Sequence, residues 1–116
     1  MKTRLMHIRV NVSNIEKAKT WYENVLGFET DGNGGWPPEK PNYYQFQSDG
    51  GAAFSIMEEK TGVSGRLNFA VSNVDELWLR LKDKTEIVEA LFDTPWGTHK
   101  FSIKDLDGNE LGFCQE

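Results

Sequence analysis

The sequence predicts an α+β domain made of two βαβββ modules in tandem. The phrase Val-Ser-Asn-Ile-Glu at 12–16 recurs as Val-Ser-Asn-Val-Asp at 71–75, 59 residues later in a chain of 116. Each copy ends an alternating apolar run and begins a helical pattern, as expected of a duplicated unit. We expect a single domain with module one over about 1–60 and module two over about 64–116. The helices should cover one side of the strands and leave the other side to line a cleft.

Module one begins with a strand and a helix. Residues 5–12 alternate in hydrophobicity, which is typical of a strand with one buried face. Ser13 and Glu16 fit a capping box, and Gly27 fits a helix C-cap. Short strands are expected over 28–30, 43–47 and 52–57, with a Gly- and Pro-rich loop at 31–41 after the first of them. The polar face of the first strand carries His7, Arg9 and Asn11, and its apolar face carries Met6, Ile8, Val10 and Val12.

Module two repeats this order. Residues 66–71 alternate, and Ser72 and Asn73 begin a helix with an apolar stripe. Strands are expected over 87–92, 98–104 and 110–114, the last two joined by a turn at 105–109. The stripe consists of Val74, Leu77, Trp78 and Leu81. The Asp-Gly and Gly-Asn pairs at 107–109 favour a turn, whereas a calcium loop would need a distal glutamate at the proper spacing.

Composition excludes several classes of partner. Acidic residues outnumber basic ones by 18 to 13, which argues against nucleic acids and anionic membranes. No apolar run approaches the roughly 20 residues that a membrane span needs. Cys114 is the single cysteine, so no internal disulfide forms and a reducing, cytoplasmic location is expected. We expect Cys114 to be a small buried thiol rather than a nucleophile.

Several motifs together resemble one known superfamily. They are the Val-Ser-Asn start of each helix, Trp21-Tyr22 followed by Leu26-Gly27-Phe28, and the closing run at 105–111. This combination resembles the vicinal oxygen chelate superfamily of glyoxalase I, bleomycin-resistance proteins, fosfomycin-resistance enzymes and extradiol dioxygenases. The resemblance implies an incomplete mixed β-barrel with a cleft, helices on the outer face, and a homodimer.

The metal-binding positions of that superfamily are only partly kept. They hold His, Glu or Gln on the first and last strands of each module, and here correspond to His7, Ser55, Arg66 and Gly112. Only His7 binds a metal well, whereas a catalytic zinc site needs three protein ligands and Arg66 has no lone pair to offer. A shifted register would bring in Glu58 or Glu110 instead. Because this chain departs from the superfamily at these positions, we expect no metal and no cofactor. A divalent ion at His7 is the alternative.

The candidate ligand-binding residues lie on the expected cleft wall and in two loops. Arg9 and Arg66 favour an anionic or carboxylate-bearing ligand, or else pair with acids such as Glu110. Trp36 and Trp96, each flanked by Pro and Gly, either stack on a ligand, or pack against a partner subunit or close the ends of the barrel. Strand parity leaves the direction of His99 open. The full set is His7, Arg9, Asn11, Trp36, Ser55, Arg66, Asn68, Trp96, His99 and Gly112.

The leading interpretation is a metal-independent small-molecule binding protein similar to bleomycin-resistance proteins, which confer antibiotic resistance. It would sequester an anionic or planar compound and form a homodimer. The alternative is a metal-dependent lyase or transferase of the glyoxalase or fosfomycin-resistance kind with His7 as a ligand. A third interpretation is a subunit or regulator without a ligand. The sequence leaves open whether any catalysis occurs.

Overall fold

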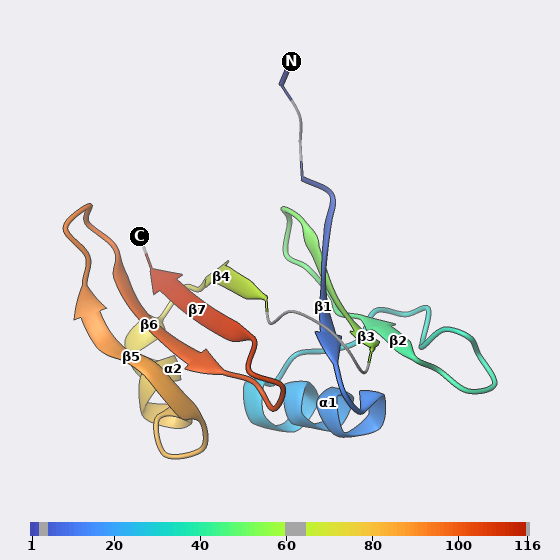
Figure 1. The fold of residues 1–116 in the computed structure, drawn as a ribbon. Coiled ribbons are helices and arrows are strands. Elements are labelled where there is room, and N and C mark those ends of the chain that lie inside the picture. Colours follow the sequence, from blue (N-terminus) through green and yellow to red (C-terminus); the bar gives the residue numbers. More distant parts are fainter. Residues whose placement is uncertain (3–4, 60–64, 116) are drawn as a thin grey trace. The chain divides into compact units, whose positions relative to one another are not determined.

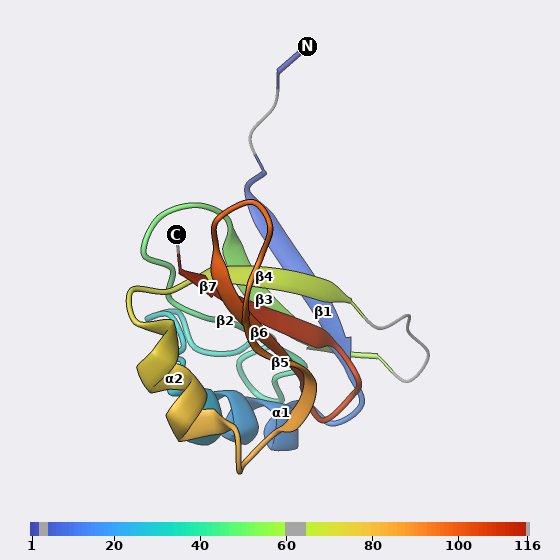
Figure 2. The ribbon, with the colours of Figure 1, turned by 90° about the vertical axis from the view of Figure 1, so that its left-hand side faces the viewer.

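The structure, a computed structural model, describes residues 1–2, 5–59 and 65–115 (Figure 1). The chain divides into two compact units, Met1–Val63 and Ser64–Glu116, which we call module one and module two and describe separately. Each module holds a helix and an open mixed sheet (Figures 1 and 2). The predicted α+β class and the βαβββ pattern are thereby confirmed. In the described part of the chain, no helix is long and apolar enough to cross a membrane.

Module one has a three-stranded sheet in the order β1-β3-β2. Its first and last strands, β1 and β3, are parallel, and β2 is antiparallel to β3. The core is an aromatic cluster in which Tyr22, fully buried, packs against Phe46 and Phe54 at ring-centroid distances of 5.4 Å. The elements are β1 (His7–Val12), α1 (Ile15–Trp21), a π-helical turn η1 (Tyr22–Leu26), β2 (Tyr43–Gln45) and β3 (Ala53–Glu58).

The helix of module one ends where the sequence predicts and begins one residue later. Gly27 adopts the left-handed conformation, with φ 79°, directly after η1. The N-cap is Asn14, whose side chain accepts a hydrogen bond from the Lys17 amide, so the capping box predicted at Ser13 is wrong. The reason is that β1 stays in the ladder through Val12, so the chain is still extended at Asn14.

The strand predicted at 28–30 is also wrong, because only an isolated bridge between Thr30 and Phe46 forms there. The Phe28 ring lies 5.8 Å from that of Tyr22 and 5.7 Å from that of Phe46. Phe28 therefore packs into the aromatic core after the helix and does not take part in a β-ladder. Bridge pairing begins only at Thr30.

Module two has a four-stranded sheet in the order β4-β7-β6-β5. Again the first and last strands, β4 and β7, are parallel, and the other pairs are antiparallel. Helix α2 packs on one face of this sheet, where Trp78 meets Phe101 with ring centroids 5.2 Å apart (Figure 2). The elements are β4 (Arg66–Ala70), α2 (Val74–Leu81), β5 (Glu86–Asp93), β6 (His99–Lys104) and β7 (Glu110–Gln115).

The segment at 105–109 is a turn, as predicted. The Asp105 carboxylate accepts hydrogen bonds from the amides of Asp107 (2.9 Å) and Asn109 (2.8 Å) and from the Asn109 side chain (2.8 Å). Asn109, fully buried, in turn accepts a hydrogen bond from the Gly65 amide at 2.6 Å. The turn therefore joins the β6–β7 hairpin to the residue that precedes β4.

Candidate functional site

In module one, His7 is held by hydroxyl groups. His7 Nε2 lies 2.6 Å from Ser55 Oγ and 3.0 Å from the Tyr43 hydroxyl. Ser55 is completely buried, and Tyr43 also donates to Gln45 Oε1 at 3.3 Å. The parallel β1–β3 ladder and the antiparallel β2–β3 ladder bring these side chains to one face of the sheet. His7 and Ser55 thus share a face as the sequence predicts, and His7 is a hydrogen-bonded residue of that face.

The other predicted residues of module one have different surroundings. Arg9 is exposed, and its Nη1 lies 2.9 Å from Met57 Sδ on the neighbouring strand. Asn11 is half-buried and has a bonding partner. Trp36 is 65% exposed, and its amide donates to the Tyr43 carbonyl at 3.0 Å, which ties its loop to β2. Among the described residues, Arg9 therefore brings a cation to this module without an acidic partner.

In module two, the position equivalent to His7 carries a partly exposed ion pair. Arg66 Nε lies 2.6 Å from Glu110 Oε2, because the parallel β4–β7 register sets the two residues side by side. The side chain of Arg66 is 66% exposed and that of Glu110 is 22% exposed. Arg66 was expected either to bind a ligand or to pair with an acid of the protein. The structure shows the pairing with an acid. Glu110 is then committed to a cation rather than to a metal.

Gly112 lies where two neighbouring side chains leave no room for a larger residue. A Cβ atom at this position would overlap Asn68 Oδ1 and would lie 3.0 Å from Lys100 Cε. The register explains this, because Asn68 flanks Gly112 on β4 and Ser102 flanks it on β6. A His, Glu or Gln side chain at 112 would have to displace Asn68. The structure thus brings Asn68 and Gly112 together, as predicted.

A hollow of about 360 Å³ opens on this face of module two. Lys100 is only 8% exposed as a residue, and it has neither an ion pair nor a hydrogen-bond acceptor within the described residues. Its ammonium nitrogen is nevertheless not a fully buried atom. Trp96, in contrast, is 76% exposed. Residues from three strands and from the β5–β6 turn line the hollow: Asn68, Phe69, Ala70, Trp96, Thr98, Lys100 and Cys114.

Lys100 is a site residue that the sequence reasoning missed. Alternation along 99–104 would have found it, since Lys100, Ser102 and Lys104 share one parity and Phe101 and Ile103 the other. Cys114 was expected to be buried inside, but it is half-buried and lines the hollow. This face therefore combines the ammonium group of a largely buried lysine, an indole ring and a thiol.

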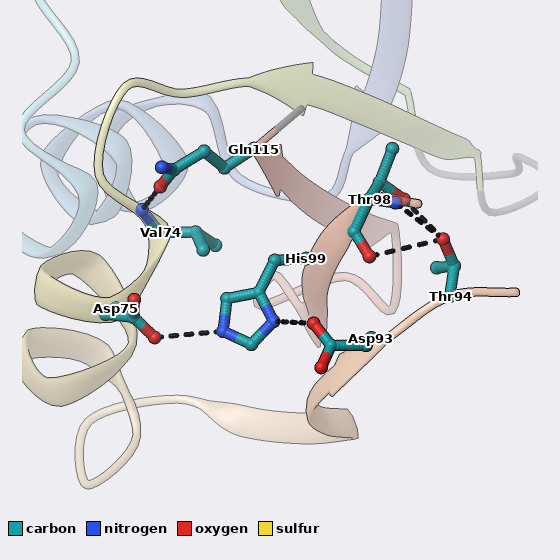
Figure 3. Close-up of polar contacts among 7 residues, drawn as sticks. All are labelled: Val74, Asp75, Asp93, Thr94, Thr98, His99 and Gln115. Carbon is teal, nitrogen blue, oxygen red and sulfur yellow. Dashed lines mark hydrogen bonds and ion pairs between the residues drawn. The ribbon is translucent and has the colours of Figure 1, made fainter. Parts of the chain in front are cut away.

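His99 lies on the opposite face of the same sheet, where α2 packs (Figure 3). Its Nε2 is 2.9 Å from Asp75 Oδ1 of α2, and its Nδ1 is 2.7 Å from Asp93 Oδ1 of β5. The hydrogen bond to Asp75 is the main cause that raises the pKa of His99, and Asp93 adds to it. His99 is thus separated by the sheet from Asn68 and Gly112, which settles the direction that strand parity leaves open and removes His99 from the residues of their face.

The turn that presents Trp96 is itself well ordered by hydrogen bonds (Figure 3). Thr94 Oγ1 lies 2.7 Å from Thr98 Oγ1 and accepts a hydrogen bond from the Thr98 amide at 3.0 Å. The Gly97 amide donates to the Thr94 carbonyl at 3.1 Å. Trp96 is therefore held at the hollow by a closed turn. Trp36 lies in module one.

The residues at the superfamily's metal positions do not fit a metal ion. They supply one imidazole held by hydroxyls, a serine, a guanidinium paired with Glu110, and a glycine. Zinc, nickel and manganese need several imidazole, thiolate or carboxylate donors around one point. Over residues 1–2, 5–59 and 65–115, no group of three or more His, Cys, Asp or Glu side chains is arranged to hold a metal.

Solved structures share this fold at low sequence identity. One is TioX from Micromonospora sp. ML1, with 21% identity and a TM-score of 0.81 over 97% of this chain and 98% of that one. Another is a lactoylglutathione lyase from Agrobacterium tumefaciens, with 16% identity and a TM-score of 0.77 over 99% of this chain and 95% of that one.

A member of the glyoxalase/bleomycin resistance protein/dioxygenase superfamily from Sphaerobacter thermophilus DSM 20745 has 20% identity and a TM-score of 0.79, covering 99% of this chain and 98% of that one. At such identities these likenesses show the fold alone. No curated protein matches the sequence. The sequence model of the Glyoxalase/Bleomycin resistance protein/Dioxygenase superfamily matches residues 4–113, and the chain therefore belongs to that superfamily.

Proposed function

We propose that this protein binds a small anionic or planar molecule without a metal ion, in the manner of the bleomycin-resistance branch of its superfamily. The ion pair between Arg66 and Glu110, with its 2.6 Å separation, is the observation that carries the proposal. Arg66 stands at the position equivalent to His7, and its guanidinium has no lone pair to offer a divalent cation. The pairing also engages the Glu110 carboxylate on β7, which would otherwise be able to bind a metal.

Two further features support the proposal. Gly112 has no donor atom in its side chain, and Asn68 fills the space into which a longer residue would reach. His7 is engaged by Ser55 and Tyr43, so a metal would have to compete with both hydroxyl groups. In each module, therefore, the residue at such a position is either engaged in hydrogen bonds or has no donor atom for a metal.

The nature of the ligand follows from the charged and aromatic side chains that remain available. Arg9 and Lys100 have no acidic partner among the described residues, so each offers a cation to an anionic group. Trp36 and Trp96 expose 65% and 76% of their surfaces, and flat aromatic compounds stack on such rings. Sequestration of such a compound in a reducing cytoplasm, by a homodimer, is the biological role we propose.

Metal analysis tests the proposal directly. We expect protein purified without chelator to hold far less than one equivalent of Zn, Ni or Mn. We also expect the change of melting temperature on adding these ions to be the same for wild type and His7→Ala. His99→Ala is the matched control, because the chain has two histidines and His99 lies outside the four positions.

One equivalent of metal that is lost in His7→Ala and retained in His99→Ala would overturn the proposal. That result would support the alternative, a metal-dependent lyase or transferase with His7 as a ligand. For the homodimer, light scattering should give twice the chain mass of 13.2 kDa. A mass equal to one chain would contradict that part of the proposal.

A further inference from the structure

We propose that the hollow of module two binds a planar aromatic compound carrying one carboxylate, with Lys100 as the charge partner and Trp96 as the stacking surface. This inference rests on the proposed small-molecule binding function. It adds the chemical class of the ligand and places the charge recognition on a residue outside the superfamily's metal positions. Three observations on the described residues carry it.

The first observation is the environment of Lys100. The residue as a whole is 8% exposed and lines the hollow, and it has no ion pair or hydrogen-bond acceptor in the described part of the chain. Its ammonium nitrogen is not a fully buried atom, so a cation without a counter-ion stands at the hollow, where an incoming carboxylate can pair with it. Gly112 makes this position available, since Lys100 Cε would lie 3.0 Å from a Cβ there.

The second observation is that nearby acids have other partners. Glu110 on β7 is paired with Arg66, and Glu89 on β5 accepts a hydrogen bond from Ser102 at 3.2 Å. Arg66, the cation that the sequence suggested for an anionic ligand, is for the same reason already neutralised. An external carboxylate would therefore meet Lys100 as an unneutralised cation.

The third observation is the apolar and aromatic part of the wall. Trp96 is 76% exposed on a turn closed by hydrogen bonds between Thr94 and Thr98, which hold the backbone that carries the ring and leave the ring uncovered. Ala70 adds apolar surface. A volume of about 360 Å³ lies near the lower end of the roughly 300–1,000 Å³ common for ligand sites, which favours a compound of one or two rings.

Cys114 provides a reporter inside the hollow. It is the single cysteine of the chain and lines the hollow together with Lys100. Two methanethiosulfonate reagents of similar size and opposite charge, sulfonatoethyl and trimethylammonioethyl, would be reacted with the whole protein, and their rates compared. The ratio of the two rates reports the sign of the local potential and does not depend on knowing the natural ligand.

We expect the anionic reagent to react faster than the cationic reagent in wild type. The ratio of the anionic to the cationic rate should fall about tenfold in Lys100→Met. Lys100→Arg keeps the charge and should retain the wild-type ratio. Lys104→Met is the matched control, because Lys104 has the same parity on β6 but does not line the hollow, and its ratio should change less than about twofold. Circular dichroism checks that each variant is folded, and Lys100→Gln replaces Lys100→Met if the latter is not.

The ligand class is tested by protection of Cys114. We expect 2-naphthoate to slow the labelling of Cys114 in wild type and in Lys100→Arg, but not in Lys100→Met, whereas neutral 2-naphthol gives no such dependence on Lys100. An unchanged ratio of rates in folded Lys100→Met, or equal protection by naphthoate and naphthol, would overturn the inference. Neither readout involves metal, so a stoichiometric metal at His7 would overturn the proposed function and leave this inference standing.

Discussion

Replacing Asp105 with alanine probes the turn that holds β4 against β7. The Asp105 side chain is buried, and its carboxylate accepts three hydrogen bonds from Asp107 and Asn109. Asn109 in turn accepts from the Gly65 amide, one residue before β4 begins. Loss of the carboxylate therefore removes the hydrogen bonds that hold Asn109, the residue that connects the turn to β4.

The expected loss of stability follows from the hydrogen bonds that the Asp105 carboxylate accepts. A hydrogen bond to a charged group contributes about 1.5–3 kcal/mol, and bonds that share one acceptor group are not additive. We expect Asp105→Ala to lower the free energy of unfolding by about 3–4 kcal/mol. Asp105→Asn keeps Oδ1, which serves both amides, and loses the bond from the Asn109 side chain, so its cost should be about 1–1.5 kcal/mol.

Urea unfolding followed by far-ultraviolet circular dichroism measures both variants. Asp49→Ala, an exposed aspartate of module one, is the control and should stay within about 0.5 kcal/mol of wild type. The reasoning is refuted if Asp105→Ala costs less than about 1 kcal/mol, or if the asparagine variant costs as much as the alanine variant.

The remaining predictions concern a histidine and a glycine. Because the hydrogen bonds to Asp75 and Asp93 raise the pKa of His99, its charged form stabilises the fold fully below the unfolded pKa of about 6.5, and this contribution is lost as pH rises through the higher folded pKa. The stability difference between wild type and His99→Gln should therefore shrink from about pH 5.5 to about pH 8.5, and a difference that grows would contradict the assignment. Gly27→Ala places a side chain at φ 79° and should cost about 1 kcal/mol in urea unfolding. Gly32→Ala, whose Cβ would meet nothing within 4 Å, should be neutral, and equal costs for the two would argue against the conformational explanation.

Much of the fold could be predicted because strands with one buried face alternate visibly. In β1, Val10 and Val12 are buried whereas His7 and Arg9 are exposed, as the sequence pattern indicates. The helix cap was misplaced because Ser13 and Asn14 are both good caps, and the choice depends on how far the β1–β3 ladder extends. That pairing joins residues far apart in the chain, so local sequence does not reveal it.

The candidate site was predicted less completely, and β6 shows why. His99 and Lys100 are adjacent, so polar residues occur on both faces where the strand begins, and the alternation that identifies Lys100 appears only from residue 100 onward. The direction of His99 is fixed by its hydrogen bonds to Asp75 on α2 and Asp93 on β5. These contacts depend on packing between elements rather than on any spacing in the sequence.

Each module joins its own first strand to its own last strand in a parallel ladder, β1 to β3 and β4 to β7. A mutation on one of these ladders therefore alters the side-chain chemistry of a single half of the molecule. The two halves accordingly differ at equivalent positions: one has an imidazole beside a buried serine, and the other has an ion pair, a glycine and a buried lysine. The ligand preference of one half can thus change without altering the ladder of the other half.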